Sequence, residues 1–316
     1  MKKNGPEKEN VVKKKSKILQ KIALVLGITI LVAAILFLGF FLYHSLTKNK
    51  ITLKKIKQQW NQYNYQEVYE LTKTYLIDDP FNNTALTYNG YASFYLAVAQ
   101  NDTYQAQLYL DDSIINMRLA IYNADPQLLP QLEYMLGKAY FYRNSISKSY
   151  YADLAVKYLT AAKEDGYESD DIAEYLGLSY ASLGMTFESI SAFSEALLYR
   201  ESESLLLSIA EQYLKAGEYN ASEQYLYRII NSSQNDEIIH NSKVLLGNLY
   251  IEKQDFSSAE AIFNEILAYD ENSPDAHYAL GLIYESQGNP IKARAEWRKT
   301  LKLQPNHNGA LKKITE

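Results

Sequence analysis

The chain has 316 residues with only 13 Gly, 7 Pro and no Cys, and its formal net charge at pH 7 is −5. So few Gly and Pro residues argue against collagen-like, linker-like or many-turned β structure. The lack of cysteine excludes disulfides, thiolate metal sites, cysteine nucleophiles and lipid anchors attached through cysteine.

The first element in chain order is an uncharged run at residues 22–43, which reads IALVLGITILVAAILFLGFFLY. A helix of this length crosses the roughly 30 Å hydrocarbon layer of a bilayer, because each residue adds about 1.5 Å. Fifteen of the 22 residues are Leu, Ile, Val or Phe. Together they favour insertion by about 5 to 9 kcal/mol. We therefore predict a transmembrane helix over residues 22–43.

A cleavable signal peptide is the alternative for this run. Its apolar region would have roughly 7 to 15 residues and would end in a small-x-small cleavage site. The run here is longer, and it continues as FFLYHS over residues 40–45 without such a site. A permanent signal anchor is therefore the expected form.

The flanks of the run predict its orientation. The basic tail at residues 1–21 contains eight Lys and two Glu, so it carries a charge of +6 and is expected to stay in the cytoplasm. Contact with nucleic acid or anionic lipid is another possible role for such a tail, but a topology signal explains it fully. Residues 44–316 are left with a net charge of −11. This acidic remainder disfavours a nucleic-acid partner, and we expect it outside the cytoplasm.

After a linker at residues 44–50, one local phrase returns along the chain, Leu-Gly-x-x-Tyr. Its copies begin at Leu136, Leu176, Leu246 and Leu280, and a degenerate copy begins at Ile209. Each copy is followed by a second amphipathic stretch. In the two clearest cases that stretch carries a small residue and a large apolar residue four positions later, Ala259 with Phe263 and Ala293 with Trp297.

This pattern resembles the tetratricopeptide repeat (TPR), a 34-residue helix–turn–helix unit. The resemblance implies an all-α chain, in which a single N-terminal transmembrane helix precedes a right-handed TPR α-solenoid. We expect about seven TPR-type helix pairs over residues 51–305 and a short capping helix at 306–316. Two repeat spacings, 47 and 40, differ from 34 by more than three residues, which predicts helix extensions or longer loops within residues 101–125 and 143–152. The register residues are Ile56, Gly90, Gly137, Gly177, Ala210, Gly247 and Gly281.

The residue types of the phrase suit the packing of two helices. A Gly or Ala on the first helix lets the second helix approach closely, and the Tyr one turn later fills the space beside it. The small and large apolar residues of the second helix form one stripe that docks on the next repeat. Each pair buries its apolar face only against its neighbours, so several repeats are needed for stability.

The resemblance also implies which side chains face the concave groove, where TPR proteins bind polypeptides. A Tyr at such a position could be a recognition anchor, being large and stiff, or only half-buried filler. The candidate partner-binding residues are Tyr134, Lys138, Phe141, Tyr278 and Glu285. The first three share one helical stripe, since they are spaced by four and three residues.

No catalytic or metal-binding pattern is found in the sequence. The four His residues lie far apart, and the phosphate-binding and nucleophile-elbow motifs are missing. The pairs Asp78-Asp79, Asp111-Asp112 and Asp170-Asp171 are expected at helix ends or in exposed turns, as solvated caps. We therefore expect no enzyme activity, no cofactor and no metal. Only Lys138 and Asn248 suit a clamp for acidic peptide tails, which the negative charge also disfavours.

The sequence thus predicts a membrane-anchored scaffold or adaptor whose groove binds a protein or peptide outside the cytoplasm, periplasmic if bacterial. The layout resembles single-span TPR proteins of bacterial secretion and envelope assembly. One alternative is an organelle import receptor with cytosolic repeats. Another is a structural membrane protein that self-associates as a homo-oligomer, through the repeats or through small residues in the span.

Overall fold

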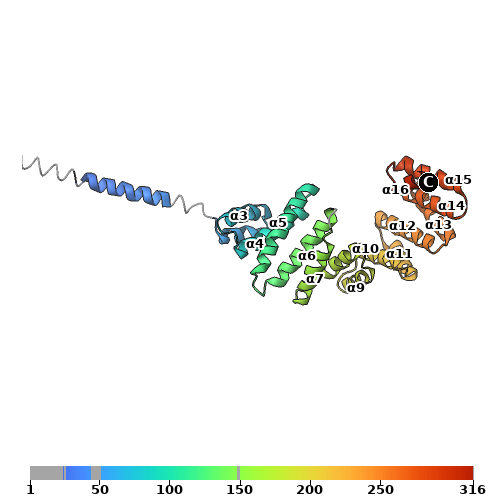
Figure 1. The fold of residues 1–316 in the computed structure, drawn as a ribbon, viewed down its shortest axis with the longest axis horizontal. Coiled ribbons are helices and arrows are strands. Elements are labelled where there is room, and N and C mark those ends of the chain that lie inside the picture. The colour runs from blue at the N-terminus through green and yellow to red at the C-terminus, as the bar shows by residue number, and fades with distance from the viewer. Residues whose placement is uncertain (1–23, 25, 44–50, 148–149, 316) are drawn as a thin grey trace, which may run out of the picture. The chain divides into compact units, whose positions relative to one another are not determined.

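The computed structural model describes residues 24, 26–43, 51–147 and 150–315 (Figure 1). Within these residues every regular element is a helix and no strand occurs, so the predicted all-α class is confirmed. The chain divides into two compact units, Met1–Gln62 and Tyr63–Glu316. The basic tail predicted at 1–21 and the linker predicted at 44–50 lie outside the described residues.

The described part of the first unit holds two helices, the apolar helix Leu26–Tyr43 and the short helix α2 (Leu53–Asn61). The apolar helix has a mean hydropathy of 2.5 over 18 residues, and none of it is buried. Its length and composition are sufficient to cross a membrane, and a signal sequence has the same properties. Helix α2 begins after Thr52, whose hydroxyl accepts a hydrogen bond from the backbone N–H of Lys55.

The second unit is a row of helices joined by short turns (Figure 1). Its helices are α3 (Tyr65–Asp78), α4 (Asn83–Val98), α5 (Thr103–Tyr122), α6 (Leu129–Ile146), α7 (Ala152–Glu164), α8 (Ile172–Ser182), α9 (Thr186–Ala196), α10 (Glu203–Lys215), α11 (Tyr219–Ser232), α12 (Asp236–Glu252), α13 (Phe256–Tyr269), α14 (Pro274–Ser286), α15 (Pro290–Leu303) and α16 (Asn308–Thr315).

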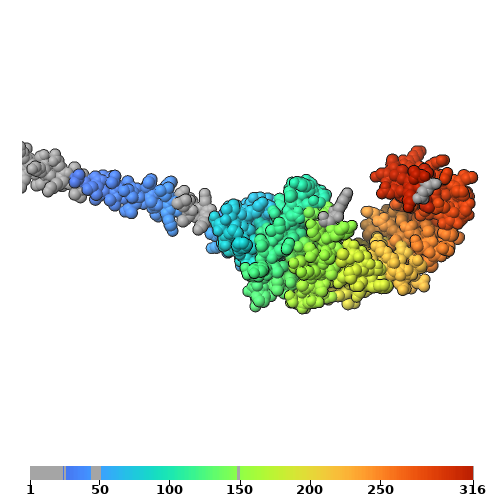
Figure 2. Space-filling view, viewed as in Figure 1, coloured from blue at the N-terminus to red at the C-terminus, as the bar shows by residue number. Residues whose placement is uncertain are grey.

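Consecutive helices pack as hairpins, from α4 with α5 to α14 with α15. We call the even-numbered member of each hairpin its first helix and the odd-numbered member its second helix. Each first helix from α4 to α12 also contacts the first helix of the next hairpin. In the space-filling view each hairpin lies directly against its neighbour along the row (Figure 2). The first helices α4 to α14 therefore share one surface, which we call the first-helix face.

The Gly of each repeated phrase lies where the two helices of a hairpin touch. Gly177 faces the ring of Phe193, Gly247 faces Phe263 and Gly281 faces Trp297, and a Cβ atom added at any of the three would overlap the ring. The predicted reason for a small residue on the first helix is thus confirmed, because only hydrogen leaves room for the aromatic side chain of the second helix.

Four hairpins close with the same turn. Just after the first helix one residue has a left-handed backbone, with φ between 58° and 76°, at Gly184, Gly217, Gln254 and Gly288. In each turn the carbonyl of the Tyr in the repeated phrase accepts a hydrogen bond from the backbone N–H five residues later, at 2.8 to 3.0 Å. This pattern closes the end of a helix and favours glycine at the left-handed position. Three of the four turns have glycine at this position, and the turn after α12 has Gln254 instead.

Helix α5 has 20 residues and is longer than any other helix from α2 to α16. It lies within residues 101–125, where the repeat spacing predicted an extension. The expectation that Asp111-Asp112 lies at a helix end or in a turn is wrong, because the pair occupies the middle of α5. Both carboxylates are partnered by other helices, since Asp111 accepts a hydrogen bond from Arg143 and Asp112 accepts one from Tyr69.

Candidate interaction surface on the first helices

All five residues predicted to bind a partner lie on first helices. Tyr134, Lys138 and Phe141 are on α6, and Tyr278 and Glu285 are on α14. The structure brings the α6 residues together with side chains from α4, α8 and the turn before α8. It places the α14 residues beside α16.

A polar cluster forms where α6 meets the start of α8. The Asp171 carboxylate, directly before α8, accepts a hydrogen bond from the Tyr134 hydroxyl at 2.7 Å and pairs with the Lys138 ammonium at 2.9 Å. Lys138 also donates to the Tyr134 hydroxyl at 3.0 Å, and the Ser169 hydroxyl donates to Asp171 at 2.5 Å. We call these four residues the α6–α8 polar cluster.

The cluster fixes the charge of its members. Burial alone would raise the pKa of Asp171, but the hydrogen bonds from Ser169, Tyr134 and Lys138 outweigh it and hold that pKa below its ordinary value of 3.8. Burial and the neighbouring carboxylate raise the pKa of Tyr134 well above its ordinary 10.0. Asp171 is therefore an anion and Tyr134 is a neutral hydrogen-bond donor. The positive charge of Lys138 is paired with the Asp171 carboxylate inside the protein.

Aromatic rings enclose the polar cluster. Tyr167 stacks on Tyr134 with centroids 4.5 Å apart, and the Lys138 ammonium lies 4.6 Å from the centroid of the Tyr175 ring. Phe141 packs edge-on against Tyr175 at 4.9 Å. Tyr134 is only 6% exposed and the Lys138 side chain 14%. Phe141 is half-buried, so it is the α6 candidate with surface left to offer.

Four members of this arrangement are not among the residues predicted from the sequence, namely Tyr167, Ser169, Asp171 and Tyr175. The sequence predicts Asp171 to be a solvated cap, but its side chain makes no capping bond to α8 and bonds to Tyr134 of α6 instead. Tyr175 lies two residues before Gly177, a position that the repeat pattern does not assign to the face. A Lys on the face of one repeat and an Asp at the start of the next first helix are the signal that could have revealed the pair.

The two α14 candidates contact the last helix. The Tyr278 ring lies 4.5 Å from the ring of His307, which is just before α16, and the Glu285 carboxylate pairs with Lys313 of α16 at 2.5 Å. Tyr278 is half-buried, whereas the Glu285 side chain is 44% exposed. Helix α16 thus covers part of α14 and leaves Glu285 accessible.

Between these two regions the first-helix face carries mainly aliphatic side chains. Each of these side chains is half-buried and partly exposed to solvent. They are Leu178, Leu207, Val244, Ile251 and Leu282. Glu211 on α10 is exposed, and within the described residues no cation pairs with its carboxylate. The middle of the face therefore offers apolar surface and an uncompensated negative charge.

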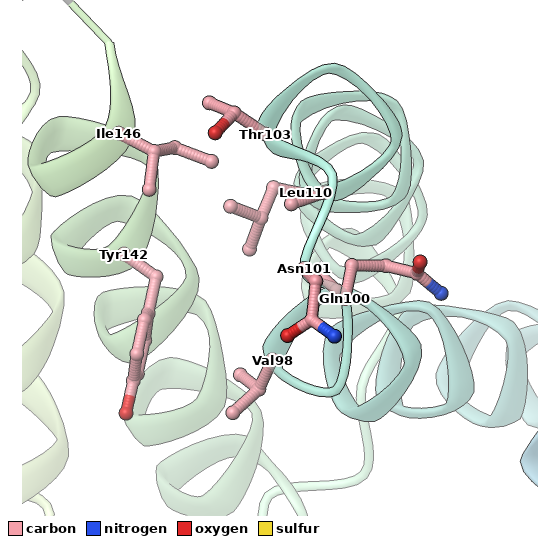
Figure 3. Close-up of a pocket in the computed structure, with 9 residues that line it drawn as sticks. Val98, Gln100, Asn101, Thr103, Leu110, Tyr142 and Ile146 are labelled. Atoms are coloured by element: carbon pink, nitrogen blue, oxygen red, sulfur yellow. The ribbon is translucent and has the colours of Figure 1, made fainter.

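A small apolar pocket opens beside this face, where the α4–α5 turn meets the end of α6 (Figure 3). It holds about 150 Å³ and is walled by Val98, Leu110, Tyr142 and Ile146, with Gln100 and Asn101 on the turn. Its size suits one aliphatic side chain and not a cofactor.

Within the described residues no group of three or more His, Asp or Glu side chains could hold a metal ion. His277 is fully engaged, with Nδ1 2.6 Å from the Glu296 carboxylate and Nε2 3.1 Å from the Glu271 carbonyl.

Comparison with known proteins gives the class of this fold. Residues 244–308 match the family model of the tetratricopeptide repeat. The matched segment contains the second half of α12 and all of α13, α14 and α15. Tetratricopeptide repeats are in general interaction scaffolds without enzyme activity. No curated protein matches the chain by sequence.

Two solved structures extend the likeness over most of the chain. The C-terminal part of a TPR repeat-containing protein from Cytophaga hutchinsonii is 14% identical, with a TM-score of 0.56, and the match covers 83% of this chain and 99% of that one. A tetratricopeptide repeat protein from Parabacteroides merdae is 16% identical, with a TM-score of 0.51 and coverage of 83% and 96%. The fold is a TPR-like α-solenoid, as the sequence predicts.

Proposed function

We propose that the chain is a membrane-anchored scaffold whose first-helix face binds a polypeptide partner outside the cytoplasm, in secretion or envelope assembly. One observation carries this proposal above the others. The middle of the face presents open aliphatic edges and the unpaired carboxylate of Glu211, whereas the polar groups at α6 and α14 already have partners. A polypeptide with apolar side chains supplies what this surface lacks.

The five predicted residues take different parts in this site. Phe141 and Tyr278 are the aromatic anchors, each with part of its ring open. Glu285 can exchange its exposed Lys313 pair for a cation or N–H of the partner. Tyr134 and Lys138 hold the α6–α8 polar cluster, which fixes the ring of Tyr175 against Phe141. Their contribution to binding is therefore to position other residues.

The location rests on the first unit. The apolar helix Leu26–Tyr43 would span the membrane, and the +6 tail would hold the N-terminus in the cytoplasm. A reporter that works only outside the cytoplasm, fused after Glu316, should be active. Activity of a cytoplasm-only reporter at the same site would reverse the topology.

Binding is tested with a photo-crosslinking side chain placed in the full-length protein in its native membrane. Position 207 on the first-helix face is compared with position 291, an exposed site on the second helix α15. The crosslinker at 207 should capture one polypeptide that the crosslinker at 291 does not. Equal capture at both positions, or none at 207, would contradict the proposal.

The captured partner then allows affinity to be separated from stability. Phe141→Ala and Tyr278→Ala should each weaken binding by about thirtyfold, the effect of losing an anchor worth about 2 kcal/mol. Tyr269→Ala is the matched control, because Tyr269 is 78% exposed at the end of the second helix α13. Unchanged affinity in both anchor variants, with normal Tm values, would place binding elsewhere.

A further inference from the structure

The outer side of α5 carries a second surface that the proposed function does not use. Five large apolar side chains on this helix are exposed, by 41% to 86%. We call them the α5 ridge, and they are Tyr104, Leu108, Ile115, Leu119 and Tyr122. Their spacings of 4, 7, 4 and 3 residues place them on one stripe, and about 27 Å separates the first from the last.

This stripe lies opposite the buried side of the helix. The buried residues of α5 include Ala106, Leu110, Ser113 and Met117, and Ser113 and Met117 pack on α4 at Gly90. At 100° per residue, these positions point about half a turn away from the ridge. The ridge therefore faces away from the hairpin and is not part of its core.

Helix α3 widens the apolar surface at one end of the ridge. Its side chains meet α5 at a constant offset of 43 residues, since Gln66 bonds to Tyr109 and Tyr69 bonds to Asp112. At the far end of the two helices, the side-chain amide of Asn83, just after the α3–α4 turn, donates a hydrogen bond to the backbone carbonyl of Asn123, just after α5, at 2.8 Å. Ile77, 76% exposed, and Phe81, 73% exposed, follow at that end. Exposed apolar side chains that gather in this way mark an interaction surface.

Other second helices do not share this feature. The other second helices have at most two exposed large apolar side chains: none on α7, one each on α9, α11 and α13, and two on α15. They are Phe187, Tyr227, Tyr269, Ile291 and Leu303. A second helix of a hairpin thus has no general need for such side chains. The ridge also coincides with the unusual length of α5, which provides the turns that display it.

Charge identifies the kind of partner. The segment 65–125, which contains the ridge, has eight carboxylates and only two cations, Lys73 and Arg118, so it holds six of the eleven net negative charges of residues 44–316. Asp111 and Asp112 lie in the gap between Leu108 and Ile115, and the Asp111 side chain is 45% exposed although Arg143 bonds to it. A second copy docked through its own α5 ridge, or an anionic membrane, would bring like charge to this surface.

We propose that the α5 ridge is a second docking site, which binds an amphipathic helix of a partner polypeptide whose apolar stripe is bordered by Lys or Arg. Leu, Ile or aromatic side chains of that helix cover the ridge. Its cations lie over the carboxylates of α3 and α5. This site is separate from the first-helix face, so either can fail without the other.

The test uses the full-length chain in phosphatidylcholine nanodiscs and two fluorescent synthetic peptides. Both are helical peptides of about 18 residues, the length of the ridge, with a leucine stripe; one has lysines beside the stripe and the other glutamates. The fluorescence anisotropy of the lysine peptide should show saturable binding, and added salt should weaken that binding. The glutamate peptide should bind about tenfold or more weakly than the lysine peptide. Empty nanodiscs measure background.

Two protein variants locate the binding. The double substitution Ile115→Ser and Leu119→Ser should weaken binding of the lysine peptide about tenfold or more. The reason is that each exposed apolar side chain removed takes away apolar surface that the bound peptide would bury. Ile291→Ser is the matched control, an exposed Ile on the second helix α15, and should leave the Kd unchanged. A Tm measurement on each variant confirms that it is folded.

Several results would overturn the proposal. The lysine peptide could fail to bind, both peptides could bind equally, or the double variant could bind as the unaltered chain does. Self-association of the full-length chain in sedimentation equilibrium, abolished by the double variant, would instead assign the ridge to a second copy. Binding of the nanodisc-held chain to phosphatidylcholine vesicles that contain no protein, abolished by the double variant, would assign the ridge to lipid.

Discussion

Two parts of the first-helix face use their side chains differently. Around α6 and α8 the polar groups bond to one another, and rings close over them. Around α10 and α12 the face carries the partly exposed aliphatic side chains of Leu207, Val244 and Ile251, and within the described residues no cation pairs with Glu211. The hairpins beneath are alike, since Gly177 meets Phe193 in one part and Gly247 meets Phe263 in the other. Residues that build the hairpins are therefore separable from residues that decide what the face does.

The largest effect is expected where the two parts are alike. Gly177→Leu and Gly247→Leu should each destabilise the protein by about 3 kcal/mol, because the new side chain must displace a buried Phe ring. Thermal and urea unfolding measure the loss. Ser182→Leu, at an exposed site on α8, is the control and should leave Tm nearly unchanged. A tolerated Leu in only one part would show that the hairpins are not equivalent.

A smaller effect should separate the two parts. Lys138→Met removes the cation from a mostly buried pair and leaves Asp171 without its charge partner, at a cost of about 2 kcal/mol, reduced because Asp171 is 32% exposed. Glu211→Gln changes an exposed and unpaired carboxylate, so its free energy of unfolding should stay within about 0.5 kcal/mol. If both variants lost the same free energy of unfolding, the two parts of the face would not differ in how their polar groups stabilise the fold.

The smallest effect concerns acid. The pKa of Asp171 lies below 3.8 in the folded protein, so the unfolded chain binds the proton more readily. The stability that Asp171 provides is present above pH 3.8 and is lost as the pH falls through the lower, folded pKa. The Tm difference between the unaltered chain and Asp171→Asn should therefore shrink on acidification from pH 6 to pH 3. A difference that grows over this range would contradict the depressed pKa.

Much of the fold is predictable from the sequence because the packing residues repeat. The Leu-Gly-x-x-Tyr phrase marks the first helices directly, since its Gly lies against a side chain of the second helix, an aromatic ring in three hairpins and Leu159 in the α6–α7 hairpin. The less regular spacing around α5 also predicts an extension where the longest of the helices α2 to α16 occurs. These signals are local, and each repeat supplies them again.

The candidate site is less predictable because its contacts join different repeats. Asp171 bonds to Tyr134 and Lys138, 37 and 33 residues away, and nothing in its own neighbourhood distinguishes it from an ordinary helix cap. Asp111 likewise finds Arg143 in the next hairpin, 32 residues away. The α5 ridge was not predicted either, because apolar residues at helical spacing are normally assigned to a core and only the packing shows which side is covered.

Gln254 has a consequence for engineering this scaffold. It occupies the left-handed turn position that Gly184, Gly217 and Gly288 fill in three other hairpins, with φ at 58°. An L-residue with a Cβ is held there at a cost of roughly 1 kcal/mol, which glycine avoids. Gln254→Gly should raise Tm, and Gln254→Val should lower it, because a β-branched side chain tolerates this backbone least. One substitution in the α12–α13 turn can thus raise the thermal stability of the helix array without altering the first-helix face or the α5 ridge.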